Sequence, residues 1–309
     1  MEQQKTKNVT LTQKEAEEYC AYKRQKKISE IMMAMRRTES ALSSGESAVK
    51  LCQQALRLRQ AAVKISPSEL LARGEVFIKS GVSLDCVIGG NGETFSSVKA
   101  YEADRAVKAG AKELTLLLSP SWILSCRYAQ LRKEIRKVRK AAKKATLKVR
   151  VGKMYPQASL ERLARIASEQ GAQYFSVPYF AGCHRLQTEL SKGCLMEISD
   201  IPSLEVFKEM AGAGMGRMIV KDAWELYSEW LKEVEKITVM EEGMQTLVGE
   251  DKQEKAEAGK ELALPVAQRE EQALLPVASA LEVKPMLAQA NAEHASAPLL
   301  VGEEQRSCS

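Results

Sequence analysis

Residues 171–180 read Gly-Ala-Gln-Tyr-Phe-Ser-Val-Pro-Tyr-Phe, and they give the clearest indication of the architecture. An alanine-rich helical pattern, residues 159–170, ends at Gly171, as helices commonly do. Tyr174 to Val177 then predict a buried strand, which Pro178 ends. In folds of parallel strands and helices, chemistry gathers at the carboxyl ends of the strands. Ser176 is therefore predicted to lie at the functional end of its strand.

Short apolar segments alternate with helical patterns on both sides of this stretch. The predicted strands are 31–35, 61–65, 84–88, 113–118, 147–151, 174–177, 194–198 and 217–220. The predicted helices are 48–59, 66–78, 97–108, 127–145, 159–170, 184–190, 203–210 and 223–236. Eight strands, each followed by a helix, predict a (β/α)8 TIM barrel with right-handed crossovers, spanning residues 31–237.

An N-terminal helical extension is predicted for residues 1–30. Thr12 and Glu15 have the spacing of a capping box, and the helix that follows has only a thin apolar stripe. This pattern is compatible with a surface helix lying on the barrel or with a helix that docks a partner.

A low-complexity acidic tail follows the barrel, at residues 238–309. From Glu241 onward the chain carries 13 acidic and 6 basic side chains and no aromatic residue. This composition predicts disorder, because too little apolar surface can be buried to offset the entropy lost on ordering. Leu264-Pro-Val-Ala267 and Leu275-Pro-Val-Ala278 are short apolar repeats, and they are either docking motifs for a protein partner or drift in a linker.

Composition excludes several classes of protein. The 309 residues, 45% of them hydrophobic, suffice for one large core. The seven cysteines have no C-x-x-C spacing, which favours free thiols in a reducing cytoplasm, and no apolar run is long enough to predict a membrane span. Cys183, His184 and Cys194 offer too few ligands for a metal site. The glycine-rich segment Gly212–Gly216 comes before a predicted strand, whereas a dinucleotide-binding loop comes after one. We therefore expect a cytoplasmic protein without metal or cofactor.

Several motifs occur in an order that resembles one known family. Cys86-Val-Ile-Gly89 is followed by Ser97-Val-Lys-Ala-Tyr-Glu-Ala103, and then by Ala109-Gly-Ala-Lys-Glu-Leu114, Leu147-Lys-Val149 and Gln170-Gly-Ala-Gln-Tyr-Phe175. This series is similar to that of the deoxyribose-phosphate aldolases (the DeoC family), over roughly residues 35–230. The resemblance implies the same barrel fold, whereas the activity has to be judged site by site.

The family cleaves 2-deoxy-D-ribose 5-phosphate to glyceraldehyde 3-phosphate and acetaldehyde through a lysine imine. The resemblance places that Schiff-base lysine on Ser176, a second lysine on Met196 or Leu195, and the acid/base aspartate on Thr115. None of these side chains can form an imine or supply the missing charge. We therefore expect a barrel that is inactive in the aldol reaction and serves as a scaffold, regulator or ligand-binding protein.

The phosphate loops of the family also differ in this chain. They fall on Ser199-Asp-Ile-Pro202 and Ile219-Val-Lys-Asp222, where two carboxylates oppose an anion and Lys221 is the one candidate phosphate ligand. The alternative is a class I aldolase that uses a relocated lysine, for which Lys64, Lys148 and Lys153 are the candidates.

The strongest non-catalytic signal is a basic segment, residues 127–153, with twelve Lys and Arg side chains and a single acid, Glu134. On a helix, Leu131, Ile135 and Val138 would form the buried stripe and the cations the remaining surface. Such a surface is either a solvated helix face or a contact for an anionic partner, namely the acidic tail, another subunit or nucleic acid. A phosphosugar ligand, a protein partner for the termini and a homodimer complete the expected partners.

Overall fold

The computed structural model describes residues 13–43, 45–152 and 155–244. Eight parallel strands close into a barrel in chain order, so that β8 pairs with β1. The strands are β1 Thr38–Ala41, β2 Ala62–Ile65, β3 Leu84–Ile88, β4 Glu113–Leu117, β5 Thr146–Arg150, β6 Tyr174–Pro178, β7 Leu195–Ser199 and β8 Arg217–Val220. The predicted TIM barrel is confirmed.

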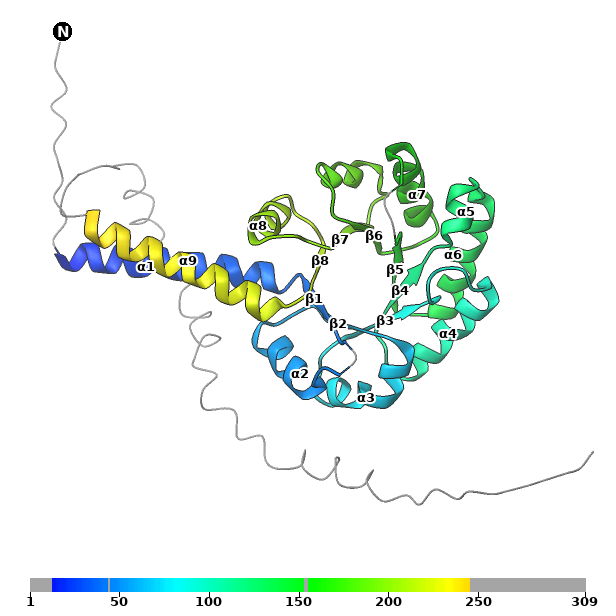
Figure 1. Ribbon diagram of the computed structural model, residues 1–309, viewed down its shortest axis with the longest axis horizontal. Helices are drawn as coiled ribbons and strands as arrows, with labels where there is room; N and C mark the ends of the chain where they lie inside the picture. The colour runs from blue at the N-terminus through cyan, green and yellow to red at the C-terminus, as the bar shows by residue number, and fades with distance from the viewer. Residues whose placement is uncertain (1–12, 44, 153–154, 245–309) are drawn as a thin grey trace, which may run out of the picture. The chain divides into compact units, whose positions relative to one another are not determined.

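Helices surround the ring of strands, as Figure 1 shows in a view along the barrel axis. They are α1 Gln13–Met35, α2 Ala48–Arg57, α3 Pro67–Lys79, α4 Ser96–Lys108, α5 Pro120–Leu124, α6 Tyr128–Ala142, α7 Gln157–Glu169, the 3-10 helix η1 Cys183–Glu189, α8 Leu204–Gly212 and α9 Ala223–Met244. Several begin with a serine whose hydroxyl accepts a hydrogen bond from the backbone three residues on, as Ser66 does from Glu69 and Ser203 from Val206.

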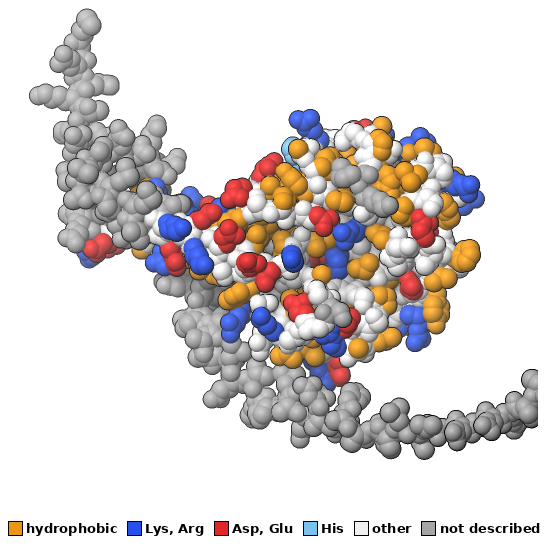
Figure 2. All heavy atoms as spheres, in the orientation of Figure 1, with side chains coloured by type: hydrophobic (Ala, Val, Ile, Leu, Met, Phe, Trp, Pro, Cys, Tyr) orange, Lys and Arg blue, Asp and Glu red, His pale blue; other side chains and the backbone are white. Residues whose placement is uncertain are grey.

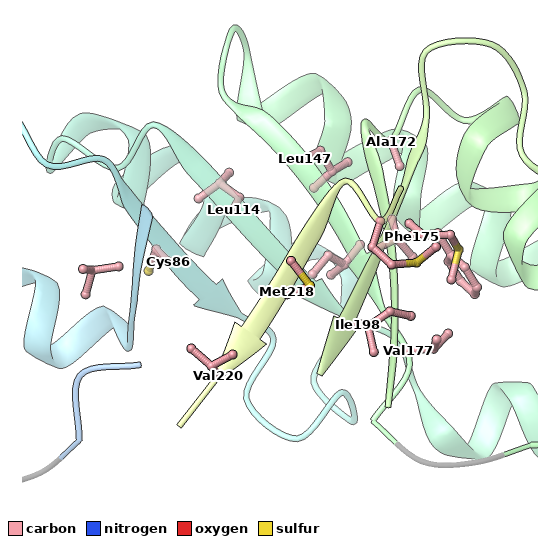
Figure 3. Close-up of a cluster of buried hydrophobic side chains, with 14 of the residues drawn as sticks. Cys86, Leu114, Leu147, Ala172, Phe175, Val177, Ile198, Met218 and Val220 are labelled. Atoms are coloured by element: carbon pink, nitrogen blue, oxygen red, sulfur yellow. The ribbon is translucent and has the colours of Figure 1, made fainter. Parts of the chain in front are cut away.

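The hydrophobic core lies between the outer face of the barrel and the helices. Successive side chains of a strand point to opposite faces, and the outward ones are apolar. Figure 3 shows part of this layer, which includes Leu114, Leu147, Phe175, Ile198 and Met218 on successive strands. All five are completely buried. The helices are held on the barrel by this layer, so the inward faces of the strands are free to carry polar side chains.

The first predicted strand is wrong. Residues 31–35 form the last turns of α1, and β1 begins at Thr38. Ile31, Ala34 and Met35 are buried, whereas Met33 is 55% exposed, which is the pattern of one helix face. A short apolar run does not by itself distinguish a strand from a buried helical segment. The predicted helix at 127–145 corresponds to α6, and the short α5 before it was not predicted.

Helix α1 packs along α9, and the two helices lie side by side at the edge of the barrel in Figure 1. Cys20 and Val234 are buried, and Arg24 lies 3.8 Å from Glu235 across the pair. Helix α1 therefore packs against α9, one of the helices around the barrel.

The chain divides into two units, Met1–Val248 and Gly249–Ser309. The capping residue predicted at Thr12 and the apolar repeats of the tail lie outside the described residues. Among the helices that the structure describes, none has the length and apolar character that a membrane crossing needs.

Candidate functional site

Charged side chains fill the inside of the barrel. Seven of them form what we call the barrel-core cluster, and each comes from a different strand: Glu39, Lys64, Asp85, Glu113, Lys148, Glu197 and Arg217. Each has a relative exposure of 8% or less. The cluster forms because these residues occupy the inward positions of their strands, where alternation turns them away from the hydrophobic layer.

Lys148 lies at the centre of the cluster. Its ammonium nitrogen is 2.8 Å from Glu113 Oε2, 3.0 Å from Glu197 Oε2 and 3.2 Å from Asp85 Oδ2, and it donates a hydrogen bond to Glu39. The side chain is completely buried. Four carboxyl groups from four strands thus enclose one ammonium group.

Lys64 is the second ammonium group of the cluster. It donates hydrogen bonds to Asp85 and, at 2.8 Å, to the hydroxyl of Thr115, and it lies 3.2 Å from Glu39 Oε2. The Thr115 hydroxyl in turn donates to Asp85 Oδ2 at 2.7 Å. Thr115 is therefore a link in the ion network, with its hydroxyl already engaged on both sides.

Arg217 closes the amino-terminal end of the barrel. It is the first residue of β8, and its guanidinium lies 3.3 Å from Glu39 Oε1 and 3.4 Å from Glu113 Oε1. The Tyr174 ring lies beneath two cations, with its centroid 5.1 Å from the Arg217 guanidinium and 5.5 Å from the Lys148 nitrogen. Cation–π contacts of this kind favour the charged forms.

The cluster contains four carboxyl groups and three cations, so full ionisation would leave one negative charge without a partner. Burial raises the pKa of Glu39 to about 7, against the opposing effect of Lys148 and Lys64. Burial alone would also raise the pKa of Asp85 and of Glu197, but the two lysines outweigh it and lower both values. A proton held on Glu39 would balance the charges of the cluster.

Both lysines are held in the ammonium form. Burial by itself lowers the pKa of Lys148, but Asp85, Glu197 and Glu39 outweigh it and raise that pKa well above its ordinary value. The same carboxylates raise the pKa of Lys64. An imine requires a neutral amine, so the electrostatics here oppose the state that covalent catalysis needs.

The structure brings together some of the predicted site residues and separates others. Ser176, Thr115, Lys64 and Lys148 all lie inside the barrel, and Ser176 is paired in register with Glu197 of β7. Met196, the neighbour of Glu197, points the other way and belongs to the hydrophobic core. Lys221 is exposed beyond the end of β8, and Lys153 lies outside the described residues.

The loop after β8 places a carboxylate at a helix start. Asp222 Oδ1 accepts hydrogen bonds from the backbone N–H groups of Trp224 and Glu225, at 2.9 and 3.0 Å. These are the donors that would otherwise be free to bind an anion at the N-terminus of α9. After β7, Asp200 has a positive φ of 57° and its carboxylate accepts from Ser199 at 3.0 Å.

Arg150 occupies the layer above the cluster, at the carboxyl end of β5. Its side chain is 21% exposed, and the guanidinium Nη2 donates a hydrogen bond to Ser199 Oγ at 3.2 Å. The nearest carboxylate oxygen of Asp200 is 3.9 Å away, and Nε is buried with no hydrogen-bond partner. Figure 2 shows acidic and basic side chains close together on the face that covers the ring of strands.

The loop between β3 and α4 is fixed by a second buried ion pair. Lys99 donates to the carbonyl oxygens of Gly92 and Leu117, at 2.7 and 3.1 Å, and to Glu134 Oε1 at 2.8 Å. Both charged side chains are completely buried. At Gly92 φ is +92°, and a Cβ would lie 2.3 Å from a backbone oxygen, so the loop requires glycine there. This side of the barrel mouth is held in place by a buried contact.

Among the described residues, one group has the composition of a metal site: Glu39, Asp85 and Glu197, whose oxygens lie within 4.8 Å of one another. The ammonium groups of Lys64 and Lys148 lie among these oxygens, where a cation would be coordinated. The arrangement therefore fits an internal ion network better than a metal centre.

The sequence-based prediction missed Glu39, Asp85, Glu197, Arg217 and Arg150. A signal for three of the strands was available, because Glu113-Leu-Thr115, Lys148-Val-Arg150 and Glu197-Ile-Ser199 alternate polar and apolar side chains. In a barrel whose outer face is covered by helices, such alternation indicates a polar interior.

The basic segment divides between the barrel interior and the surface of α6. Leu131, Ile135 and Val138 are buried as predicted, and the one acid, Glu134, pairs inward with Lys99. Lys148 and Arg150 lie in the barrel, and other cations of the segment contact neighbouring helices, as in the Lys143–Asp104 and Arg132–Glu169 pairs. An exposed row remains on one side, formed by Lys133, Lys137, Lys140 and Lys144.

Comparison with known proteins links the chain to one family. It is 32% identical over 111 residues to the deoxyribose-phosphate aldolase of Mannheimia succiniciproducens, and the match covers 36% of this chain and 50% of that protein. The chain spans half the length, or less, of the curated relatives that it matches. No family model matches.

Solved structures agree in fold along almost their whole length. A putative deoxyribose-phosphate aldolase from Coccidioides immitis has a TM-score of 0.60 at 22% identity, covering 69% of this chain and 96% of that one. The deoxyribose phosphate aldolase of Aeropyrum pernix, described as a unique tetramer, has a TM-score of 0.57 at 21% identity, covering 67% and 96%.

Proposed function

We propose that this barrel, which is similar to the deoxyribose-phosphate aldolases over part of its sequence and in fold, works without the imine chemistry of that family, as a scaffold, regulator or ligand-binding protein. The single observation that carries this proposal is the ionic state of the barrel interior. Lys64 and Lys148 are buried among carboxylates, and both have a raised pKa.

A Schiff-base lysine has to be neutral for part of the time near pH 7, which burial or a neighbouring cation achieves by lowering its pKa. In this barrel Glu39, Asp85 and Glu197 act in the opposite direction on the two interior amines. With a shift upward from an ordinary value of about 10.4, fewer than roughly one amine in a thousand is neutral at pH 7. A relocated lysine at either position would therefore be a poor nucleophile.

The acid/base and phosphate positions support the same proposal. The Thr115 hydroxyl bonds Lys64 and Asp85, so it has no free role in moving a substrate proton. Asp222 occupies the start of α9, where it would repel a phosphate group. Lys221 is exposed, and we retain it as a weak phosphate contact at most.

The proposal is tested by trapping. The intact protein is incubated with acetaldehyde and borohydride, ethyl adducts are located by mass spectrometry, and cleavage of 2-deoxy-D-ribose 5-phosphate is assayed in parallel. We expect no cleavage, and we expect Lys64 and Lys148 to be modified more slowly than exposed Lys137, which reports that the reagents are active. Substrate cleavage, or an adduct on Lys64, Lys148 or Lys153 that forms ahead of Lys137, would establish the alternative, a working aldolase with a relocated lysine.

Partner binding forms the second half of the proposal. The row of Lys133, Lys137, Lys140 and Lys144 is exposed and makes no ion pair with the described residues, so it is the surface that an anionic partner would contact. The chain termini are proposed to bind a protein partner, and a second copy of the chain is a further candidate.

A further inference from the structure

Arg150 is placed where a barrel holds its ligand. It ends β5, it pairs in register with Ser176, and its side chain faces the interior two residues beyond Lys148. Lys148 is completely buried, whereas the Arg150 side chain is 21% exposed, so the guanidinium lies in the layer that opens to solvent. This is the carboxyl end of the strands, the usual site of binding in such barrels.

The guanidinium of Arg150 is incompletely paired. Of its five N–H donors, one hydrogen bond is made within the described part of the chain, to Ser199 Oγ at 3.2 Å. The Nε atom is buried and has no partner. Asp200 is 3.9 Å away, beyond hydrogen-bond distance, and its side chain is 69% exposed, so that contact is worth little. A buried donor without an acceptor costs free energy, and an incoming oxyanion would remove that cost.

We propose that Arg150 anchors a small oxyanion, a carboxylate or a phosphate monoester, in a non-covalent site at the mouth of the barrel. The planar fork of a guanidinium matches two oxygens of either group, and Ser199 adds a hydroxyl beside it. Asp200 competes with the ligand, and its exposed carboxylate turns toward solvent when the ligand binds. The inference deepens the ligand-binding role proposed above, and it places the anchor on β5, away from the loops after β7 and β8.

The test uses the full-length protein and two probes, inorganic phosphate and succinate, titrated by calorimetry at low ionic strength. We expect saturable binding of at least one probe. Arg150→Met should weaken it roughly 10- to 100-fold, as expected for the loss of hydrogen bonds to a charged group. Arg150→Lys keeps the positive charge but loses the planar fork. If a carboxylate is the preferred group, this variant should weaken the binding of succinate more than that of phosphate. If charge alone matters, the binding of both probes should weaken equally.

Asp200→Asn provides a second test of the site, which remains available if the Arg150 variants fail to fold. The side chain is exposed, so the fold should tolerate the change, and removal of the competing carboxylate should tighten binding several-fold. Arg136→Met, a substitution on α6 outside the barrel, serves as a control with unchanged binding. The inference is overturned if neither probe binds, or if Asp200→Asn leaves the affinity of the wild type unaltered. This result is independent of the trapping experiment, since the site can bind an anion whether or not an imine forms.

Discussion

At the scale of single residues, the pKa shift of Lys148 has the opposite sign from that of a catalytic amine. Its neighbours Glu39, Asp85 and Glu197 stabilise the ammonium form, and the other cations of the cluster, Lys64 and Arg217, are themselves paired with carboxylates. One substitution at Ser176 would therefore not restore an imine site, since the whole surrounding cluster favours protonated amines.

Glu39 gives a prediction for pH dependence. It faces Lys148, Lys64 and Arg217, together with the carboxylates of Asp85 and Glu197. Its pKa is about 7 in the folded protein and 4.5 ordinarily, so between these values the unfolded chain loses a proton that the folded chain keeps. Stability contributed by this group is complete below pH 4.5 and is lost as the pH rises to about 7.

The measurement compares the free energy of unfolding of the wild type with that of Glu39→Gln from pH 4.5 to pH 8. Relative to Glu39→Gln, the wild type should lose about 3 kcal/mol of unfolding free energy as the pH rises to 7, since one pKa unit corresponds to about 1.4 kcal/mol. At higher pH the difference between the two proteins should stay constant. Asp85 and Glu197, whose pKa values are lowered, act in a separate window: their contribution is present above their ordinary pKa and is lost on acidification. A difference that does not change between pH 4.5 and 7 would show that Glu39 holds no extra proton.

At the scale of elements, the outer faces of the strands made most of the fold predictable. β3 and β8 have the predicted bounds, and the other strands except the first lie within one residue of theirs at each end. The first strand was not predicted because Thr38-Glu-Ser-Ala41 has no apolar run. Its inward residue, Glu39, is charged and pairs with Lys148 inside the barrel. Met and Ala, which favour helix, fill the preceding apolar segment.

The end of α1 provides a test of this correction. Ile31→Ala should destabilise the protein by about 2–5 kcal/mol, because the isoleucine is completely buried and its loss leaves a cavity. Met33→Ala, two residues away on the exposed side of the helix, should change stability by less than about 0.5 kcal/mol. Both values come from urea denaturation. Equal losses at the two positions would contradict a helical end, since a strand would place both side chains on one face.

At the scale of the whole molecule, the two sides of the barrel wall have different origins of stability. The outer layer is apolar and packs the helices, whereas the inner layer is an ion network that closes only when all the strands are in place. Glu39 and Lys148 are 109 residues apart in the sequence, so no local pattern could predict their contact. The sequence pointed to Ser176 and Thr115 as substituted catalytic positions and to Lys64 and Lys148 as possible replacement lysines, but the carboxylates around them became visible only with barrel closure.

The ionisation state of Lys64 and Lys148 decides whether this barrel can form an imine, and it can be measured. The side-chain ammonium groups of ¹⁵N-lysine-labelled protein can be followed by nuclear magnetic resonance through a pH titration, because buried ammonium protons exchange slowly enough to be observed. We expect Lys64 and Lys148 to remain protonated up to and beyond pH 10.5 for as long as the barrel stays folded, because the surrounding carboxylates raise the pKa of both amines. A titration of either amine near neutral pH would contradict it and would restore an imine-forming lysine to the centre of the barrel.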